Sequence, residues 1–475
     1  MTERTLRAEP RPETTGAPPP PHRLVLPIIL TCQLMLILDA TVMNVALPRI
    51  QSDLGFTDTG LSWVMTAYSL VFGGLLLLGG RAGDLFGRRR MFIAGTAVFT
   101  AASLLGGLAG SAEMLIAARI AQGVGAALAG PSTLALITST FTEAKARVRA
   151  LALFSAMSSS GFAIGLLLGG LLTEWISWRA ALYINVPFGL AIVLLTSRYV
   201  ADPPRRRARL DLPGAVTGTF GVGSLVFAFT HAASHGWGDT ITLGSLAAGL
   251  ALLAAFLRIE TRVSEPLIPL RLFAERNRAA AYVNFLLGPM AMMSMFFFLT
   301  QFLQDIAGFA ALETGFAFLP MAVCMFLLSR LIPRLLPRFG PKPLALTGTA
   351  LMTGGVVWLT TLTTDSGYFS HLLGPMLLMG VGAGLAFSPL SVIIMATVPT
   401  DDAGAAGGVL QTMQQVGATL GLAILITVFG AVTRTPSGSP AETTVDGMTS
   451  AFTIAAVVTA ASFLVALTFR RRERA

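Results

Sequence analysis

The sequence is poor in charge. Only 12% of its 475 residues are Asp, Glu, Lys or Arg, whereas 54% are hydrophobic. Because soluble domains carry about 25% charged residues, this composition excludes an ordinary soluble globular protein and belongs to the membrane class. Uncharged stretches of eighteen residues or more recur along the chain. Each is long enough to cross roughly 30 Å of hydrocarbon.

Cysteine and lysine are also scarce. The two cysteines, Cys32 and Cys324, both lie in apolar stretches. This placement argues against a disulfide framework and favours packing roles. Neither of the two lysines is followed by Ser or Thr, so the Gly-Lys-Ser/Thr end of a P-loop is missing. The chain also has no Gly-x-Ser-x-Gly elbow. We therefore expect no enzyme, and any pumping must be driven by an ion gradient rather than by ATP through that motif.

Histidine is nearly absent as well. Of the four histidines only His231 and His235 form a close pair. Without a neighbouring carboxylate or cysteine in the sequence, two histidines are more typical of a membrane interface than of a metal site. The sequence therefore predicts no metal and no cofactor.

The apolar stretches predict an all-α polytopic membrane protein with fourteen transmembrane helices. An outer-membrane barrel would need alternating strands of about ten residues instead. The expected spans are 24–47, 61–80, 91–110, 113–137, 150–172, 180–198, 213–233, 241–258, 279–303, 314–331, 343–363, 371–396, 404–430 and 450–469.

The basic residues predict the orientation. With the N-terminus in the cytoplasm, 29 of the 33 Lys and Arg residues fall in inner segments, three fall in outer loops, and Arg119 lies within a span. The positive-inside rule therefore places both termini in the cytoplasm. Clusters between apolar spans are typical of contacts with anionic lipid headgroups, so the net charge of +9 does not indicate nucleic acid.

Two halves of the chain resemble each other. Phe86-Gly87 and Gly95-Thr-Ala recur 253 residues later as Phe339-Gly340 and Gly348-Thr-Ala. The pair Gly161 and Gly165 has a counterpart in Gly417 and Gly421, 256 residues away. These offsets predict two six-helix bundles with two extra helices between them. Secondary transporters commonly have such repeats, with a binding site near midplane at their interface.

Asp39 and Arg119 are the main candidates for chemistry, because an ionisable residue within a span is costly and is by default functional. Counting about 1.5 Å per residue along their helices puts both in the outer half of the membrane at similar depths. A direct or water-bridged pair is therefore possible. Asp39 can sense protonation or substrate, or the two residues can form a fixed ion pair that holds the first bundle together.

Other polar and soft side chains are candidates for substrate contact. Gln122 shares a helix face with Arg119. Three amides, Gln411, Gln414 and Gln415, occupy about one turn of a single span; substrate contacts and helix-to-helix hydrogen bonds are equally good interpretations. Met293 and Phe297 belong to a Met- and Phe-rich stretch that either adapts to varied apolar ligands or simply packs.

Several motifs carry a resemblance to a known family. They are the first-span motif Leu38-Asp39-Ala-Thr-Val-Met-Asn44-Val-Ala-Leu-Pro48, the loop Gly80-Arg-Ala-Gly-Asp84-Leu-Phe-Gly87-Arg88-Arg89-Arg90, and Arg119-Ile-Ala-Gln122-Gly123-Val-Gly125. Together with Trp178-Arg179, Asn185-Val-Pro187, Pro266-Leu-Ile-Pro269 and Leu319-Pro320, they make residues 24–470 resemble the fourteen-helix drug:proton antiporters of the major facilitator superfamily.

The resemblance implies roles for these residues. Asp39 and Arg119 would couple to protons, and Asn44 would contact substrate. Gly80, Asp84, Gly87, Arg88, Arg89 and Arg90 would form a gating loop, although the arginines alone also fit a topology signal. One departure is that the fifth-span antiporter motif has Leu166 in place of proline, which removes the expected kink. The remaining glycines of that motif retain a helix-packing role: Gly161, Gly165, Gly169 and Gly170.

We therefore expect a secondary transporter that exports lipophilic drugs, antibiotics or toxic natural products from a bacterium by proton antiport and alternating access. A metabolite carrier on the same fold is an alternative, as is a non-transporting membrane sensor. The expected partners are a small lipophilic substrate, protons and membrane lipids, and the expected state is a monomer in the cytoplasmic membrane.

The expected divisions of the chain are a disordered tail (1–23), a six-helix bundle (24–200), a linker with two extra helices (201–278), a second bundle (279–470) and a short tail (471–475).

Overall fold

The protein is almost entirely α-helical. A computed structural model describes residues 22–57, 60–141, 143–201, 211–264, 266–395, 398, 403–434 and 438–469, with some helical side chains, Asp84 among them, outside that description. Within these ranges there is no strand. Eleven helices are long and apolar enough to cross a membrane, by length and composition. The chain is therefore a multi-pass membrane protein.

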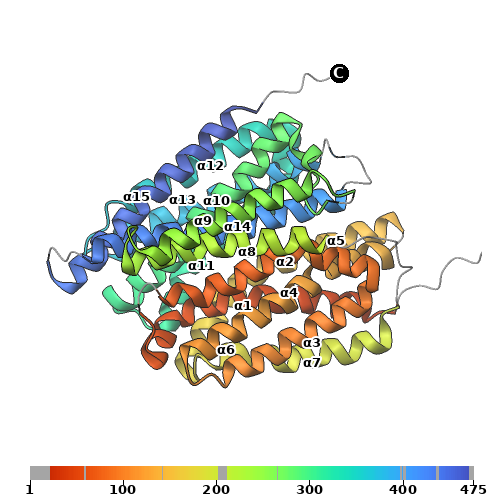
Figure 1. Ribbon diagram of the computed structural model, residues 1–475, viewed down its shortest axis with the longest axis horizontal. Helices are drawn as coiled ribbons and strands as arrows, with labels where there is room; N and C mark the ends of the chain where they lie inside the picture. The colour runs from red at the N-terminus through yellow and green to blue at the C-terminus, as the bar shows by residue number, and fades with distance from the viewer. Residues whose placement is uncertain are drawn as a thin grey trace, which may run out of the picture.

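The helices of the first part of the chain lie together in Figure 1. They are α1 (Val25–Leu54), η1 (Gly60–Ser62), α2 (Trp63–Phe86), α3 (Arg88–Gly107), α4 (Ala112–Thr140), α5 (Ala144–Trp175), the short α6 (Ala180–Tyr183) and α7 (Asn185–Tyr199). Next come α8 (Leu212–His235) and α9 (Thr240–Glu260).

The second part begins after the short η2 (Leu270–Phe273). It contains α10 (Arg276–Gln301), α11 (Ala311–Phe339), α12 (Pro341–Leu359), α13 (Leu373–Met395), α14 (Ala403–Thr433) and α15 (Pro440–Leu467). Two π-helical segments adjoin these helices: η3 (Phe302–Ile306) follows α10, and η4 (Tyr368–Leu372) precedes α13.

Each predicted span overlaps a helix, or the pair α6–α7 in the case of 180–198. The count of fourteen membrane crossings stays a prediction, because eleven helices satisfy length and composition. Several helices extend well beyond the predicted spans, among them α2, which ends at Phe86, and α11, which ends at Phe339. Helix α1 continues past Pro48 to Leu54. Helix α15 begins at Pro440 rather than at 450, because Ser439 and Glu442 form a capping box there.

The repeated glycines occupy equivalent places in the two parts of the chain. A Cβ on Gly95 of α3 would lie 2.6 Å from the carbonyl oxygen of Gly125 in α4. A Cβ on Gly348 of α12 would lie 2.6 Å from the carbonyl oxygen of Gly382 in α13. Since real Cβ atoms do not approach backbone this closely, both helix pairs depend on glycine for their packing distance.

The turns between the paired helices are also alike. Gly87 separates α2 from α3 with φ +104°, and Gly340 separates α11 from α12 with φ +76°. Both values lie in the region that only glycine adopts readily, so each tight turn requires the residue found there.

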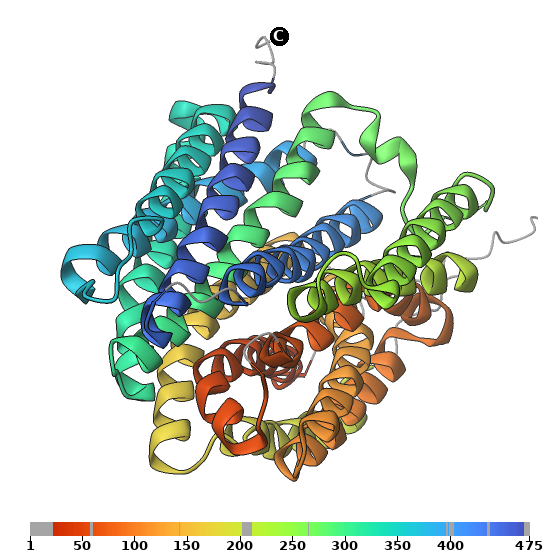
Figure 2. The ribbon, with the colours of Figure 1, turned by 60° about the vertical axis from the view of Figure 1, so that its left-hand side comes forward.

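The two parts meet along two seams. Helix α5 packs against α11, α2 packs against α14, and α1 reaches α10. The pair α8–α9 lies at one edge of the bundle, where α8 contacts both α2 and α14; Figure 2 shows this yellow-green pair beside blue α14 and the orange helices. Helix α8 is fastened to α14 by the Thr427 hydroxyl, which donates to the Phe229 carbonyl at 2.5 Å.

Candidate functional site

Asp39 of α1 and Arg119 of α4 form a direct ion pair inside the first part of the molecule. The Arg119 Nη1 atom lies 2.5 Å from Asp39 Oδ2, and both side chains are fully buried. The predicted proximity of these residues is therefore realised in the structure. Breaking a buried pair by removing one partner is strongly destabilising, so the pair holds α1 against α4.

Two amides complete the surroundings of the Asp39 carboxylate. Gln122 Nε2 and Asn185 Nδ2 each donate to Asp39 Oδ1 at 2.8 Å. The Ser103 hydroxyl of α3 accepts from the same two amides, at 2.8 Å and 3.4 Å. Four helices, α1, α3, α4 and α7, thus converge on one carboxylate that has donors on both oxygens.

Arg119 has acceptors other than Asp39. Its Nε donates to the Val64 carbonyl at 2.9 Å, and its Nη1 donates to Gln122 Oε1 at 2.8 Å. Its guanidinium also lies over the Tyr68 ring, 4.4 Å from the centroid. Its Nη2 is buried without a hydrogen-bond partner. The guanidinium therefore keeps contacts with α2 and α4 whether or not Asp39 is charged, and its Nη2 remains available as a donor.

Part of this cluster was not among the predicted site residues. Asn185, Ser103 and Tyr68 were not predicted to take part, although Asn185 belongs to the motif Asn185-Val-Pro187. The available signal was a polar side chain inside an apolar span, which by itself marks many packing residues. Gln122, predicted as a substrate contact, lies in the cluster with both polar atoms occupied by Asp39, Arg119 and Ser103.

Asn44, also predicted to contact substrate, bridges the two parts of the molecule. Its Nδ2 donates to Thr300 Oγ1 at 2.9 Å and to the Phe296 carbonyl at 3.4 Å. One turn further out, Gln304 Nε2 donates to the Val45 carbonyl at 3.0 Å. These contacts tie α1 to the end of α10 that the charge distribution places outside.

A second outer contact joins α5 to α11. Glu174 Oε2 accepts from the Leu312 backbone N–H at 2.9 Å. A Cβ on Gly170 would lie 2.6 Å from Leu312 Cα, and one on Gly315 would lie 2.6 Å from the Leu166 carbonyl oxygen. The two helices therefore touch backbone to backbone at their outer ends.

The other glycines of α5 face α1. A Cβ on Gly165 would lie 1.8 Å from Thr41 Oγ1, and one on Gly169 would lie 2.9 Å from Val42 Cα. At Gly161 the nearest atom, at 3.0 Å, is the end of the Leu34 side chain. With leucine at position 166, α5 runs without interruption from Ala144 to Trp175.

Met293 and Phe297, which were predicted to contact substrate, both lie in α10 but differ in burial. Phe297 is only 1% exposed and packs edge to face on Phe298 at 5.3 Å, whereas Met293 is partly buried. The Phe298 ring also contacts Phe429 at 5.4 Å. Phe297 is therefore a core residue in this state, and Met293 is the more accessible of the two.

The three amides of α14 lie near the seam with α2. Gln415 packs against Gly73, where a Cβ would lie 2.5 Å from the Gln415 Cβ. Gln411 is exposed, and Gln414 and Gln415 are partly buried. Within the described residues none of the three side chains forms a hydrogen bond. Of the two interpretations, the helix-to-helix hydrogen bonds are not formed among the residues that the structure describes.

The loop between α2 and α3 places two of its arginines against backbone carbonyls of neighbouring helices. Arg88 Nη1 donates to the Ala135 carbonyl of α4 at 3.3 Å. Arg89 donates to the Thr196 carbonyl at 3.4 Å and also to the Ser197 carbonyl of α7. The last carbonyls of a helix carry negative potential, so the contacts of Arg89 with the end of α7 are favourable. A Cβ on Gly80 would make only ordinary contact with Pro131, at 3.7 Å. Arg90 is exposed, and the side chain of Asp84 lies outside the described residues.

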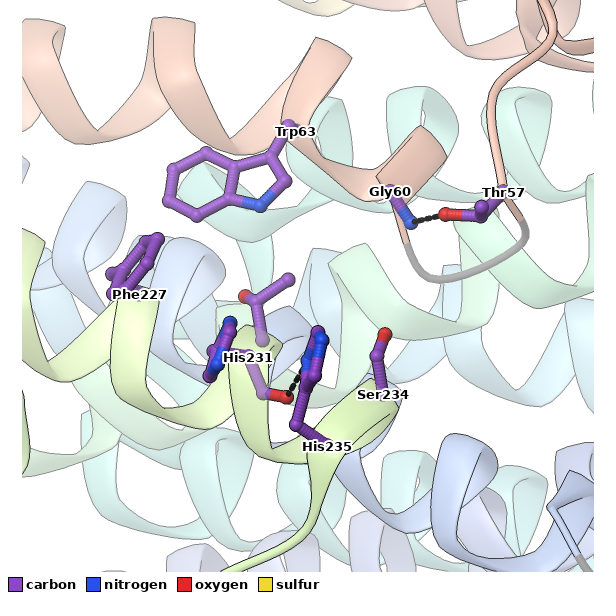
Figure 3. Close-up of a pocket in the computed structure, with 8 residues that line it drawn as sticks. Thr57, Gly60, Trp63, Phe227, His231, Ser234 and His235 are labelled. Carbon is purple, nitrogen blue, oxygen red and sulfur yellow. Dashed lines mark hydrogen bonds between the residues drawn. The ribbon is translucent and has the colours of Figure 1, made fainter. Parts of the chain in front are cut away.

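A small pocket opens at the predicted outer end between α2 and α8 (Figure 3). Its volume is about 140 Å³. The His231 and His235 rings stack at 4.0 Å, and Phe227 stacks on His231 at 5.5 Å. Asp239 Oδ2 lies 3.2 Å from His231 Nε2, so the histidine pair does have a carboxylate neighbour, contrary to the interpretation of the sequence. Within the described residues no group of three potential metal ligands is present.

The pKa of Asp239 is lowered from its usual value. The largest cause is the hydrogen bond from the Thr242 N–H, with further lowering by the Ile241 N–H and by His231. The carboxylate caps the start of α9 through these N–H groups. Asp239 is therefore a stable cap that stays ionised and positions His231 at the mouth of the pocket.

Sequence comparison identifies relatives across most of the chain. The model of the Major Facilitator Superfamily matches residues 29–422. The cephamycin export protein CmcT of Amycolatopsis lactamdurans is 42% identical over 87% of this chain and 85% of its own length. The puromycin resistance protein pur8 of Streptomyces alboniger is 43% identical, covering 90% and 87%. The lincomycin resistance protein of Streptomyces lincolnensis is 33% identical, covering 85% and 84%.

Solved structures of similar shape show the same fold. A bacterial homologue of the human lysosomal transporter Spinster, inward-facing and unoccupied, has a TM-score of 0.66 at 16% identity, covering 94% of this chain and 97% of that one. The nucleoside transporter NupG has a TM-score of 0.65 at 14% identity, covering 94% and 98%. At this level of identity the likeness concerns the fold alone.

Proposed function

The chain belongs to the major facilitator superfamily, and we propose that it exports small lipophilic antibiotics or other toxic natural products across the bacterial cytoplasmic membrane by proton antiport and alternating access. The observation that carries the proton-coupling part is the fully buried Asp39 carboxylate, paired with Arg119 at 2.5 Å. The cargo is proposed from the relatives, whose names specify cephamycin, puromycin and lincomycin.

The proposed architecture has fourteen crossings with both termini in the cytoplasm. Residues 24–200 and 279–470 form the two bundles, residues 201–278 carry the inserted pair α8–α9, and the chain works as a monomer. Support comes from the equivalent packing of Gly95 and Gly348 in the two bundles. The charge distribution supports the orientation.

Asp39 can take up a proton without leaving Arg119 wholly unpaired. When Asp39 becomes neutral, Arg119 loses an ion partner but keeps the Val64 carbonyl and Gln122 Oε1 as acceptors. When the proton leaves, Asp39 Oδ1 accepts from the Gln122 and Asn185 amides. The cluster therefore has two states, and each keeps most of its hydrogen bonds.

Protonation is coupled to movement through α1 in this proposal. The same helix carries Asp39 in the ion-pair cluster and Asn44 in the outer contact with Thr300. Weakening the hold of α4 on α1 frees α1 to change its contact with α10. Because an antiported proton enters from outside, it binds while the outer seam is open, and the freed α1 then closes that seam as the carrier returns inward. Release of the proton to the cytoplasm restores the ion pair, and the cargo crosses outward on the other half of the cycle.

The three amides of α14 are proposed as polar contacts for the cargo. Gln411, Gln414 and Gln415 have hydrogen-bonding groups without partners in the described part of the chain. Met293 supplies a partly buried, adaptable apolar surface. Polar groups of this kind orient a ligand in a pocket that is otherwise apolar.

The proposal is tested by efflux from energised cells that express the protein. A gradient of about 100 mV supplies about 2.3 kcal/mol per charge, enough for roughly a fifty-fold substrate gradient per proton. Efflux of puromycin or lincomycin should collapse on addition of a protonophore while ATP is maintained. Export that continues without the gradient contradicts proton antiport. Unchanged resistance to every antibiotic tested, with uptake or export of a metabolite, favours the alternative carrier.

A further inference from the structure

Two buried carboxylates face each other at the predicted cytoplasmic ends of α8 and α9. Asp211 immediately precedes α8, Glu260 is the last residue of α9, and each is only 4% exposed. Asp211 Oδ1 accepts from the Gly214 N–H at 2.8 Å, and Glu260 Oε2 accepts from the Ile268 N–H at 2.9 Å. One oxygen of each carboxylate therefore has a structural task.

The other two oxygens converge without a donor between them. Asp211 Oδ2 and Glu260 Oε1 are buried and have no hydrogen-bond partner. A Cβ on Gly214 would lie 2.4 Å from the first and 3.0 Å from the second. Both oxygens thus border the same small space, which only glycine at position 214 leaves open.

Two buried carboxylates in this arrangement cannot comfortably both be charged, because burial and like charge each disfavour ionisation. Within the described residues no base forms an ion pair with either one. Of the bases on the adjoining elements, Arg258, Arg262 and Arg271 are exposed. Buried Arg278 donates to the Leu272 and Arg271 carbonyls.

We propose that Asp211 and Glu260 form a second proton-binding site, in which one proton is shared between Asp211 Oδ2 and Glu260 Oε1. A proton needs only these two oxygens. Calcium takes six to eight oxygen ligands and magnesium requires an octahedral set, whereas the described residues hold no cluster of three potential ligands. The ligand is therefore a proton rather than a divalent cation.

The site fastens the inserted helices to the second bundle. Glu260 holds the Ile268 N–H, and Ile268 lies in the segment that leads through η2 into α10. Loss of the proton places two charges together and weakens this attachment. The cytoplasmic proton concentration then controls how firmly α10 is tied to the α8–α9 pair. This goes beyond the proposed antiport, since the proton is not the one carried by Asp39.

The test compares the thermal unfolding of the full-length wild type and Glu260→Gln in detergent as pH rises. The glutamine amide can donate to Asp211 Oδ2 while its oxygen accepts from the Ile268 N–H, so it imitates the protonated site without titrating. In the wild type the folded state holds a proton that the unfolded chain has lost. Its folding constant should therefore fall by up to about tenfold per pH unit, relative to the variant, until the site deprotonates.

Glu275→Gln is the matched control. Glu275 caps α10 through the Asn277 and Arg278 N–H groups, at 3.0 Å and 2.7 Å, and should keep the wild-type pH slope. If Glu260→Gln does not fold, Asp211→Asn serves instead, because Asn caps a helix as well as Asp and can donate to Glu260.

Three results would overturn the proposal. In the first, the wild type and the neutral variants have the same pH slope. In the second, wild-type stability rises with pH relative to them, which indicates a charged pair neutralised by a base. In the third, magnesium alone stabilises the wild type but not the variants, which indicates a cation site. None of these results bears on antiport, because transport is not measured.

Discussion

At the residue scale, Asp39 has two roles that are compatible with one geometry. The carboxylate is held by Arg119, Gln122 and Asn185, as a structural ion pair requires. It is also an acid whose main partner retains other acceptors when the proton binds. The structural role can be measured as stability and the proton-carrying role as transport, because neutralising Asp39 affects each in a different way.

Asp39→Asn should abolish gradient-driven efflux and lower stability. The amide keeps the size of the side chain but leaves Arg119 buried without its ion partner, which costs about 3–5 kcal/mol of the free energy of unfolding. Adding Arg119→Gln should restore part of that stability but not efflux. The measurements are thermal unfolding and efflux for both single variants and the double variant.

Asp53→Asn on the same helix is the matched control. Asp53 is exposed, and its carboxylate binds Trp178 and Arg179 at the outer surface. Because a surface ion pair contributes about 0–1 kcal/mol, this variant should keep its efflux. Uphill efflux by a stable Asp39→Asn protein would show that another group carries the transported proton.

The sequence was informative about the ion pair and less so about its surroundings. Depth along a helix follows from residue spacing, so Asp39 and Arg119 could be placed at similar levels. Which other side chains face them depends on helix rotation and crossing angle. Asn185 and Ser103 reach the pair from α7 and α3, and residue spacing alone does not fix those contacts.

At the element scale, α5 is one uninterrupted helix whose glycines allow close packing against two different neighbours. Gly165 and Gly169 fit α5 to α1 within the first bundle, whereas Gly170 fits it to α11 across the seam. The substitution of proline by Leu166 leaves the helix uninterrupted. Close packing is thus retained without the proline of the antiporter motif.

Gly170→Ala should loosen the outer contact between α5 and α11. The added Cβ would lie 2.6 Å from Leu312 Cα and 2.7 Å from the Ala311 carbonyl oxygen, so backbone must move. Overpacking of this kind costs about 1–3 kcal/mol. The temperature of thermal unfolding should fall, and efflux should slow. Gly354→Ala in α12, where a Cβ meets nothing within 4 Å, should leave both unchanged; equal behaviour of the two variants would refute the packing argument.

Arg89→Gln should slow the transport cycle without preventing insertion. Arg89 fixes the loop before α3 to the Thr196 and Ser197 carbonyls at the end of α7, and many other inner arginines remain to set topology. Transport and substrate binding should be measured separately in reconstituted vesicles. Arg262→Gln, which removes an exposed inner charge, is the control. A wild-type rate in Arg89→Gln would reduce the loop to a topology signal.

Element boundaries show what hydropathy leaves out. The start of α15 was missed because its apolar residues begin only later in the helix. Ser439, Pro440 and Glu442 are nevertheless recognisable signals of a helix start. The π-helical extension Phe302–Ile306 had no such signal. Its existence depends on how α10 ends against neighbouring helices, a tertiary effect.

At the scale of the whole molecule, the repeat was the most predictive feature of the sequence. Constant offsets between glycines indicated two related bundles, and Gly95 and Gly348 do make equivalent contacts. The arrangement of the bundles relative to each other was not predictable. One sequence must support several such arrangements during transport, so no local pattern can specify the one observed here.

The described contacts between the bundles identify that arrangement. Asn44 with Thr300, Gln304 with Val45, and Glu174 with Leu312 all lie at the ends that the positive-inside rule places outside. In the proposed orientation, these contacts close the outer side in this state. Alternating access requires them to separate when cargo leaves.

A reversible cross-link across the outer seam should therefore stop transport. Cysteines at Glu174 and Leu312, whose Oε2 and backbone nitrogen are 2.9 Å apart, join α5 to α11 in a background in which Cys32 and Cys324 are replaced. A short, membrane-impermeant thiol cross-linker added outside intact cells should abolish efflux, and a reductant should restore it. Cysteines at Asp53 and Arg179, an ion pair at 2.9 Å within the first bundle, are the control. Those two positions move together, so the same cross-link should leave efflux intact. Full efflux with the seam cross-linked would exclude rocking at this interface, and reaction only in inverted vesicles would reverse the proposed orientation.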